Sequence, residues 1–131
     1  VLAMYSPLSS VRVFFNRIRG VKIGKKVYLG LGTMLGNHPW LVSIGDYVHV
    51  SAGTKIITHD LSFVAHGKKD YAAPVKIERK AHIGMNCVIL PGVTIGEESI
   101  IQAGSVVAKD VPRNTLVYGV PARVACKIYE A

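Results

Sequence analysis

The sequence predicts an all-β fold: a parallel β-helix of six-residue repeats, with a short helix at one end and an excursion loop. Its main signal is a set of aliphatic side chains that recur every six residues, a period that neither an α-helix nor an ordinary strand produces. Glycine directly follows six of these aliphatics. Such a period is typical of solenoids whose stacked repeats bury one continuous core. The repeated positions are Ile23, Leu29, Leu35 and Leu41, then Ile44, Val50 and Ile56, and finally Ile77, Ile83, Ile89, Ile95, Ile101 and Val107.

Residues 1–20 differ from the repeats and are predicted to form a helical cap. Ser9 or Ser10 suits the start of a helix, and Gly20 suits the left-handed residue that ends one. Because the end coil of a solenoid exposes apolar surface, we expect the apolar face of the helix to cover it. The alternative is that this face anchors the protein to a membrane surface. The apolar positions with helical spacing are Val11, Phe14, Phe15 and Ile18.

The repeats occupy residues 21–112, and residues 113–131 are predicted to close the C-terminal end. The period slips by three residues around His38-Pro39-Trp40, where we expect a small surface excursion. A longer break, the loop at residues 62–76, follows neither period. Long irregular loops in compact domains are usually functional, so we expect this one to form the lid or wall of a site. Glycine at the second position of a repeat is expected to supply the positive φ of a turn.

Composition limits the function classes. The 131 residues carry a formal net charge of +8, but the basic residues are scattered and not interleaved with aromatics, which argues against nucleic acid. Several of them gather in the last third of the chain, around Lys109, Arg113, Arg123 and Lys127, which fits a small phosphate-bearing ligand; a charge excess that only improves solubility is the alternative. No apolar run is long enough for a transmembrane segment. Two cysteines are too few for a disulfide framework. Cys87 occupies a fifth repeat position, where a small buried side chain is needed, and we interpret it as a core thiol of a cytoplasmic protein.

The later repeats resemble the hexapeptide-repeat acyltransferases. The resemblance is carried by the runs at residues 83–96 and 103–112 and by Gly119-Val120-Pro121-Ala122-Arg123, and it extends over about residues 21–128. Within that family the chain looks most like the maltose and galactoside O-acetyltransferases and those of surface-polysaccharide synthesis. The resemblance implies a left-handed coil, acetyl-CoA as acyl donor, a sugar-like acceptor, and a homotrimer whose active sites lie between subunits.

His59 is the predicted catalytic residue. Acetyl transfer to a hydroxyl needs a general base, and histidine has a suitable pKa near neutral pH. Of the histidines at positions 38, 49, 59, 66 and 82, His59 lies in Thr58-His59-Asp60, directly before the long loop, where the family has its catalytic histidine. A backbone carbonyl or Asp60 is expected to hold the other ring nitrogen. His82 falls where the family often carries a tryptophan, and His38 is a weaker candidate for the acceptor site.

The resemblance also implies ligand-binding residues. Lys109 and Arg123 would neutralise the nucleotide phosphates of acetyl-CoA. The acceptor is expected to contact Asn37, Trp40 and Asp60, since an amide and an aromatic ring suit a sugar. The residues carried over for the acyl donor are Gly84, Met85, Ala103, Gly104, Ala108, Lys109 and Arg123.

Other functions stay open at this stage. The same base and groove would serve N-acetylation of an amino-sugar or a small xenobiotic, and a non-catalytic scaffold would keep the same repeats. A γ-class carbonic anhydrase shares the β-helix but needs three zinc-binding histidines on adjacent faces. His59 and His66 are seven residues apart, with His66 inside the loop, so the spacing predicts no metal site.

Overall fold

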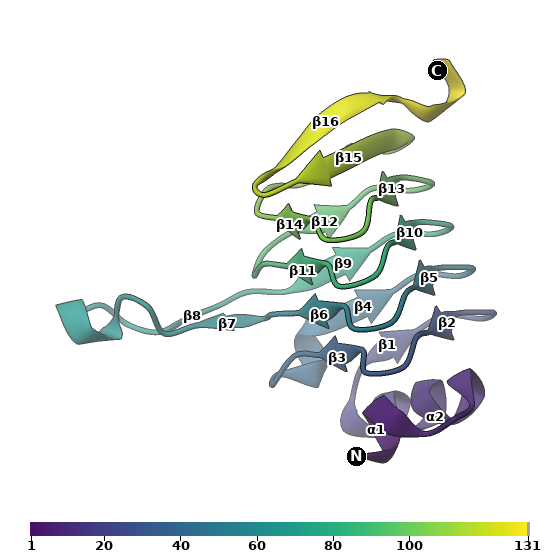
Figure 1. The fold of residues 1–131 in the computed structure, drawn as a ribbon. Helices are drawn as coiled ribbons and strands as arrows, with labels where there is room; N and C mark the ends of the chain where they lie inside the picture. The colour runs from purple at the N-terminus through teal and green to yellow at the C-terminus, as the bar shows by residue number, and fades with distance from the viewer. Residues whose placement is uncertain (131) are drawn as a thin grey trace.

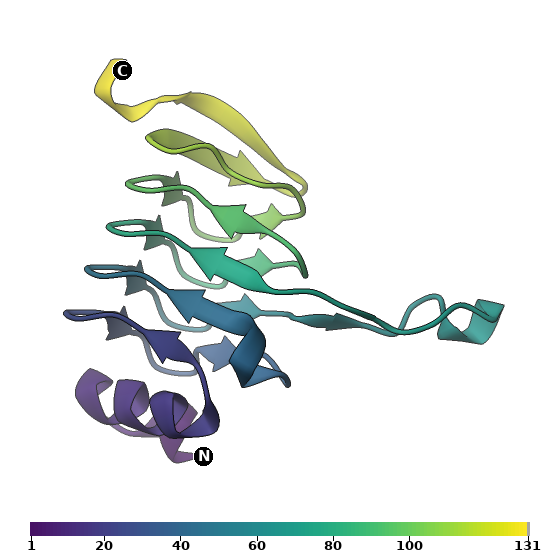
Figure 2. The same ribbon diagram turned by 180° about the vertical axis from the view of Figure 1, so that it is seen from behind.

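Three sheets of parallel strands stack into a three-sided solenoid in the computed structural model, which describes residues 1–130 (Figures 1 and 2). The first sheet contains β1 (Lys22–Ile23), β4 (Val42–Ile44), β9 (Val75–Ile77) and β12 (Thr94–Ile95). The third contains β3 (Met34–Leu35), β6 (Lys55–Ile56), β11 (Val88–Ile89) and β14 (Val106–Val107). The second contains β2 (Tyr28–Leu29), β5 (His49–Val50), β10 (His82–Ile83), β13 (Ile100–Ile101), β15 (Thr115–Gly119) and β16 (Ala122–Lys127), the last of which pairs antiparallel to β15.

The core is the column of repeated aliphatics. In the first sheet Ile23, Ile44, Ile77 and Ile95 lie in register on successive coils, and the other two sheets repeat the arrangement. The side chains from Ile44 onwards are almost entirely buried, so each coil is held mainly by its neighbours above and below. The expectation of a mostly β chain built on six-residue repeats is confirmed.

The corners differ from the prediction in where the positive φ falls. Glycines at the second repeat position do not have it, with the exception of Gly36. Glycine is needed at these positions because the backbone of the next coil lies too close for a side chain. A Cβ on Gly30 would lie 2.3 Å from the backbone nitrogen of Ala52. Positive φ occurs instead at the fourth position, three residues after the buried aliphatic. The non-glycine residues there, with φ between 54° and 61°, are Lys26, Tyr47, Lys80, Asn86, Glu98 and Asn114.

The residues at the fifth position of each repeat are small and mostly buried, because there is little room inside a corner of the three-sided solenoid. Hydroxyls at these positions donate to nearby carbonyls, as Thr54 Oγ1 does to the carbonyl oxygen of Gly84 at 2.8 Å. Cys87 is fully buried, and its thiol lies 3.2 Å from the carbonyl oxygen of Gln102. Burial raises the pKa of the Cys87 thiol, which therefore stays protonated near neutral pH.

Two helices, α1 (Leu2–Tyr5) and α2 (Ser9–Arg19), lie against the first coil (Figure 1). Gly20 ends α2 in the left-handed conformation, as predicted. The predicted serine cap is wrong, because Leu8 is the N-cap residue. Ser9 instead accepts a hydrogen bond from the backbone N–H of Leu29 at 3.0 Å, while Arg12 Nε donates to the Leu29 carbonyl oxygen at 2.8 Å.

The face of α2 that packs on the solenoid is also different from the predicted one. Its buried residues are Arg12, Val13 and Asn16, whereas Phe14 and Ile18 are 57% and 65% exposed. The reason is that the end of a β-solenoid presents unpaired backbone groups as well as apolar surface. Polar side chains that can pair with those groups are therefore favoured on the packing face, and the apolar stripe is left on the outside.

Between β6 and β9 the chain leaves the solenoid as a long arm (Figures 1 and 2). β7 (His59–Asp60) pairs antiparallel with β8 (Tyr71–Ala72), and the short 3-10 helix η2 (Val64–His66) lies beyond them. The predicted loop extends too far, because residues 75 and 76 already belong to β9 and pair with β4. The slip in the period corresponds to a second 3-10 helix, η1 (Pro39–Leu41), and a third, η3 (Ile128–Glu130), follows β16. None of the helices in residues 1–130 has the length and apolarity needed to cross a membrane.

Candidate active site

One edge of the solenoid gathers most of the predicted functional residues. We call it the site edge: the corner between the third and first sheets, formed by residues 36–41, 57–74, 90–93 and 108–110. Successive coils place Asn37, His59, Pro91 and Lys109 along it. Because strands of the third sheet stack in register, the residues that follow them on successive coils come together at this edge. Asn37, Pro91 and Lys109 each lie two positions after their strand, and His59 lies three positions after β6.

A cleft of about 680 Å³ opens where the arm leaves the site edge. Three of the residues singled out in the sequence, Asn37, His59 and Asp60, line it together. Trp40 does not line the cleft, although it lies nearby on η1 with 63% of its surface exposed. The complete lining is Asn37, Ile57, His59, Asp60, Leu61, Ser62, Leu90 and Pro91.

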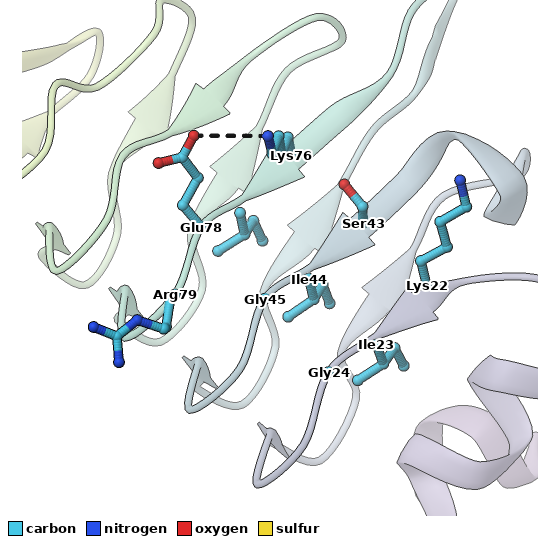
Figure 3. Close-up of a pocket in the computed structure, with 10 residues that line it drawn as sticks. Lys22, Ile23, Gly24, Ser43, Ile44, Gly45, Lys76, Glu78 and Arg79 are labelled. Carbon is cyan, nitrogen blue, oxygen red and sulfur yellow. Dashed lines mark ion pairs between the residues drawn. The ribbon is translucent and has the colours of Figure 1, made fainter.

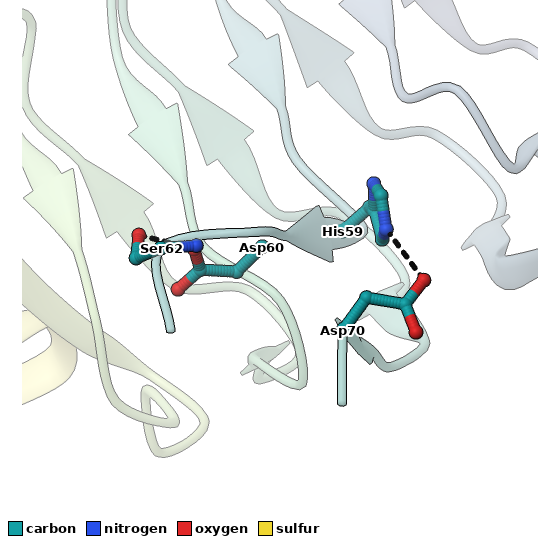
Figure 4. Close-up of polar contacts among 4 residues, drawn as sticks. All are labelled: His59, Asp60, Ser62 and Asp70. Atoms are coloured by element: carbon teal, nitrogen blue, oxygen red, sulfur yellow. Dashed lines mark hydrogen bonds and ion pairs between the residues drawn. The ribbon is translucent and has the colours of Figure 1, made fainter. Parts of the chain in front are cut away.

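His59 is paired with a carboxylate from the returning strand of the arm (Figure 4). Its Nε2 lies 3.0 Å from Oδ2 of Asp70. The β7–β8 pairing sets Ala72 opposite His59, which brings Asp70, two residues earlier, within reach of the ring. The His59 side chain is 20% exposed and that of Asp70 is 61% exposed. Such a solvent-exposed pair contributes only about 0–1 kcal/mol to stability, so its main effect is to fix the orientation of the imidazole.

Asp60, one of the two partners considered for His59, hydrogen-bonds to another residue. Its Oδ1 accepts hydrogen bonds from the hydroxyl of Ser62 and, at 2.8 Å, from the Ser62 backbone N–H (Figure 4). The hydroxyl contact first, and the backbone contact second, lower the pKa of the Asp60 carboxyl. Asp70 was therefore missed by the sequence analysis. In the sequence Asp70 is only an acidic residue near the end of an irregular loop. Nothing in that context indicates that the loop forms a hairpin that brings Asp70 close to His59.

His38 is closer to the site than its sequence context suggested. Its ring centroid lies 5.0 Å from that of His59 and 5.3 Å from that of Trp40, both in edge-to-face arrangements. His38 Nδ1 is buried and has no hydrogen-bond partner among residues 1–130. Buried polar atoms are normally satisfied, so this nitrogen is an exception to the usual pattern beside His59.

The residues carried over for the acyl donor form two separate groups. Lys109 and Arg123 line a common cavity of about 250 Å³ beneath β16, and Ala108 precedes Lys109 in the chain. The other four, Gly84, Met85, Ala103 and Gly104, lie at the opposite edge of the third sheet. Neighbouring coils meet there, and the backbone N–H of Gly104 donates to the carbonyl of Met85 at 2.8 Å. A single chain therefore does not bring this second group to His59.

Three other histidines lie outside the cleft. His66 is in η2 of the arm, and His49 and His82 stack on the outer face of the second sheet at 4.8 Å between centroids. Tyr28 extends this stack, 4.5 Å from His49. Burial first, and the charge of His82 second, lower the pKa of His49. Within residues 1–130, no three histidine, cysteine or acidic side chains gather as a metal site would require.

A second hollow, of about 420 Å³, lies over the first sheet (Figure 3). Lys22, Ser43 and Lys76 lie in register on its surface, and Lys76 Nζ is 3.9 Å from Oε1 of Glu78. None of the residues predicted to bind donor or acceptor lines this hollow, and it contains no histidine. The cleft at the site edge is therefore the better candidate for an active site.

Comparison with known proteins agrees with this geometry. Residues 74–109 match the family model described as bacterial transferase hexapeptide (six repeats). Galactoside O-acetyltransferase of Escherichia coli (strain K12) is 34% identical over 122 residues, which cover 88% of this chain and 58% of that protein. The chain spans about half the length of the curated relatives it matches.

Solved structures share the same architecture. A maltose O-acetyltransferase from Clostridium difficile 630 has a TM-score of 0.74 and 26% identity, over 95% of this chain and 79% of that one. A hexapeptide-repeat acetyltransferase from Vibrio cholerae, complexed with acetyl coenzyme A, has a TM-score of 0.70 and 26% identity, over 96% and 81% of the two chains. The family match, the relatives and the shared architecture together show that the chain belongs to the hexapeptide-repeat transferase family.

Proposed function

We propose that the protein transfers an acetyl group from acetyl-CoA to a hydroxyl group of a sugar or polysaccharide precursor, with His59 as general base. The observation that carries this proposal is that His59, whose Nε2 lies 3.0 Å from Asp70, lines an open cleft of about 680 Å³. The similarity to a galactoside O-acetyltransferase and to a structure with bound acetyl coenzyme A supports the choice of acceptor and donor.

In the proposed reaction Asp70 holds the Nε2–H of His59, which leaves Nδ1 with a free lone pair. Nδ1 accepts the proton of the acceptor hydroxyl as its oxygen forms a bond to the thioester carbonyl carbon. The carbon–sulfur bond then breaks, and the imidazolium returns the proton to the departing thiolate of CoA. The carboxylate of Asp70 stabilises the imidazolium between the two steps.

The acceptor would bind along the cleft wall. Asn37 and Asp60 line the same cleft as His59 and can hydrogen-bond to sugar hydroxyls there. Trp40 does not line the cleft, but its exposed ring lies beside His38 and would provide an apolar surface for a sugar ring that extends out of the cleft.

The donor would bind between subunits of a homotrimer, and we infer a left-handed coil on the strength of the same family resemblance. Lys109 and Arg123 would contact the phosphates of CoA. Residues 84, 85, 103 and 104 lie at the edge opposite His59, so a neighbouring subunit would be needed to bring such a group to the cleft. Exposed apolar side chains on the arm, including Leu61, Phe63 and Tyr71, support its contact with a neighbour. Light scattering should give three times the mass of one chain.

The activity can be tested by following thiol release from acetyl-CoA with a panel of sugars, nucleotide-sugars and amino-sugars. Turnover of hydroxyl acceptors is expected. Turnover of amines alone would replace the proposed O-acetylation by N-acetylation, and the absence of turnover with every acceptor would favour a non-catalytic scaffold.

Replacing Asp70 with asparagine is expected to lower kcat by roughly 10–100-fold, a part of the 10²–10⁴-fold that a positioned base contributes. The Michaelis constants should change little, because Asp70 acts on His59 and not on the substrates. Steady-state kinetics of D70N and D60N separate the two acids. D60N should mainly raise KM for the acceptor, and an equal loss of kcat in both variants would contradict the assignment of Asp70 as the positioning residue.

Replacing Lys109 or Arg123 with alanine is expected to raise KM for acetyl-CoA about tenfold, because each variant loses one charge-assisted contact worth roughly 1.5 kcal/mol. Acetyl-pantetheine, which lacks the nucleotide phosphates, should show no such change. The matched control is Lys127→Ala, on the same strand as Arg123 but outside the cavity. Equal effects on both donors would show that the two residues do not contact the phosphates.

A further inference from the structure

The outward face of the N-terminal cap is apolar and uncovered. At about 100° per residue, the midpoint between Phe14 and Ile18 lies roughly 170° from the centre of the three buried positions of α2. Leu2 of α1 adds a further apolar side chain, 54% exposed, and the cap forms one end of the solenoid (Figure 1). None of the elements in residues 1–130 packs over Phe14 and Ile18, which remain more than half exposed.

The same end of the molecule is strongly cationic. Residues 1–45 contain six of the 16 basic residues and none of the eight acidic ones. Arg17 and Arg19 flank the apolar stripe and are held by backbone carbonyls of the first coil, of Gly24 at 2.7 Å and of Gly36 at 2.9 Å. Lys25 and Lys26 are exposed on the first corner of the solenoid. No ion pair within residues 1–130 involves any of these basic residues.

We propose that this end of the molecule, the helical cap with the first coil, binds the surface of an anionic lipid bilayer. Phe14 and Ile18 would enter the headgroup region while the flanking basic side chains contact lipid phosphates. Charge decides between a bilayer and a second copy of the chain. Two copies joined through this face would bring six basic residues of each copy together. The nearby carboxylate of Asp46, whose Oδ1 accepts a hydrogen bond from the Lys25 backbone N–H at 2.9 Å, offsets only a part of that charge, whereas an anionic bilayer balances the rest.

This binding geometry leaves the candidate active site in water. The cap lies at one end of the stack, and the arm with His59 projects sideways from its middle (Figure 1). A cap lying on a bilayer therefore does not cover the cleft. The inference uses only the cap and the first coil, so it does not depend on the proposed acetyl transfer.

Vesicle co-sedimentation of the full chain tests the proposal, with phosphatidylcholine vesicles prepared with or without phosphatidylglycerol. Binding to the anionic vesicles should be at least about tenfold tighter, and it should weaken as added salt shortens the Debye length. The double variants F14Q/I18Q and K25E/K26E should each lower the bound fraction at least about fivefold. Matched controls at the opposite end of the solenoid are Val124→Gln and Lys127→Glu on β16, and neither should alter binding.

Equal binding to neutral and anionic vesicles, or no binding at all, would overturn the proposal. So would losses in the β16 controls as large as those in the cap variants. If F14Q/I18Q lowered the particle mass in solution without vesicles, the face would be a contact between copies of the chain. The lipid and salt comparisons use the unaltered protein, so they decide the question even if a variant misfolds.

Discussion

Replacement of His59 by alanine is expected to lower the rate of acetyl transfer by about 10²–10⁴-fold, the contribution of a positioned general base. The acceptor hydroxyl would keep its proton as it attacks, and among the described residues 1–130 no other histidine lines the cleft to take it. Thiol release from acetyl-CoA under saturating donor and acceptor measures the loss. Stability should be preserved, because His59 lies on β7, outside the stacked core.

His66 provides the matched control for this experiment. It lies on the same arm but in η2, and it does not line the cleft. His66→Ala should therefore retain nearly all activity. A His59→Ala protein with unchanged turnover would show that the base lies elsewhere, and His38, whose ring is 5.0 Å from that of His59, would become the next residue to test.

Gly30→Ala is expected to destabilise the fold by about 3 kcal/mol, the upper part of the range for overpacking. The added Cβ would lie 2.3 Å from the nitrogen of Ala52 and 2.6 Å from the carbonyl carbon of Ser51, both in the backbone of the next coil. Backbone atoms in a stacked solenoid move only if the coils separate. The urea midpoint of unfolding, followed by circular dichroism, should fall accordingly.

The variant Gly104→Ala distinguishes the two reasons for glycine in this fold: close approach of the next coil, and a positive φ. Gly104 has φ 75°, but an added Cβ would meet no atom within 4 Å. Its cost should be that of a left-handed non-glycine residue alone, about 1 kcal/mol. If the two variants lost equal stability, the second-position glycine would not be serving the contact between coils.

The solenoid could be predicted because the six-residue period is a local signal that occurs again in every repeat. Where the structure differs, the deciding factor was not local. The amphipathic pattern of residues 11–18 indicated a helix, but not which face would pack. That depended on the unpaired N–H and carbonyl of Leu29, which only the assembled coil presents to Ser9 and Arg12.

The site divides in the same way. His59 could be proposed from its family context, and the structure places it with Asn37 and Asp60 in one cleft. Asp70 could not be proposed, because its approach to His59 depends on the strand register of an arm that has no repeat. Both breaks in the period, at η1 and at the arm, lie on the site edge of the solenoid.

The arm also has a consequence for how such proteins diversify. The coils on either side of it stack without a gap, since β4 pairs directly with β9 in register. Lengthening, shortening or exchanging the arm therefore leaves every core contact between these coils in place. Under the proposed function, exchanging the arm would change the contacts with the acceptor while the stacked coils stay the same. Chimaeras with exchanged arms should fold as readily as either parent.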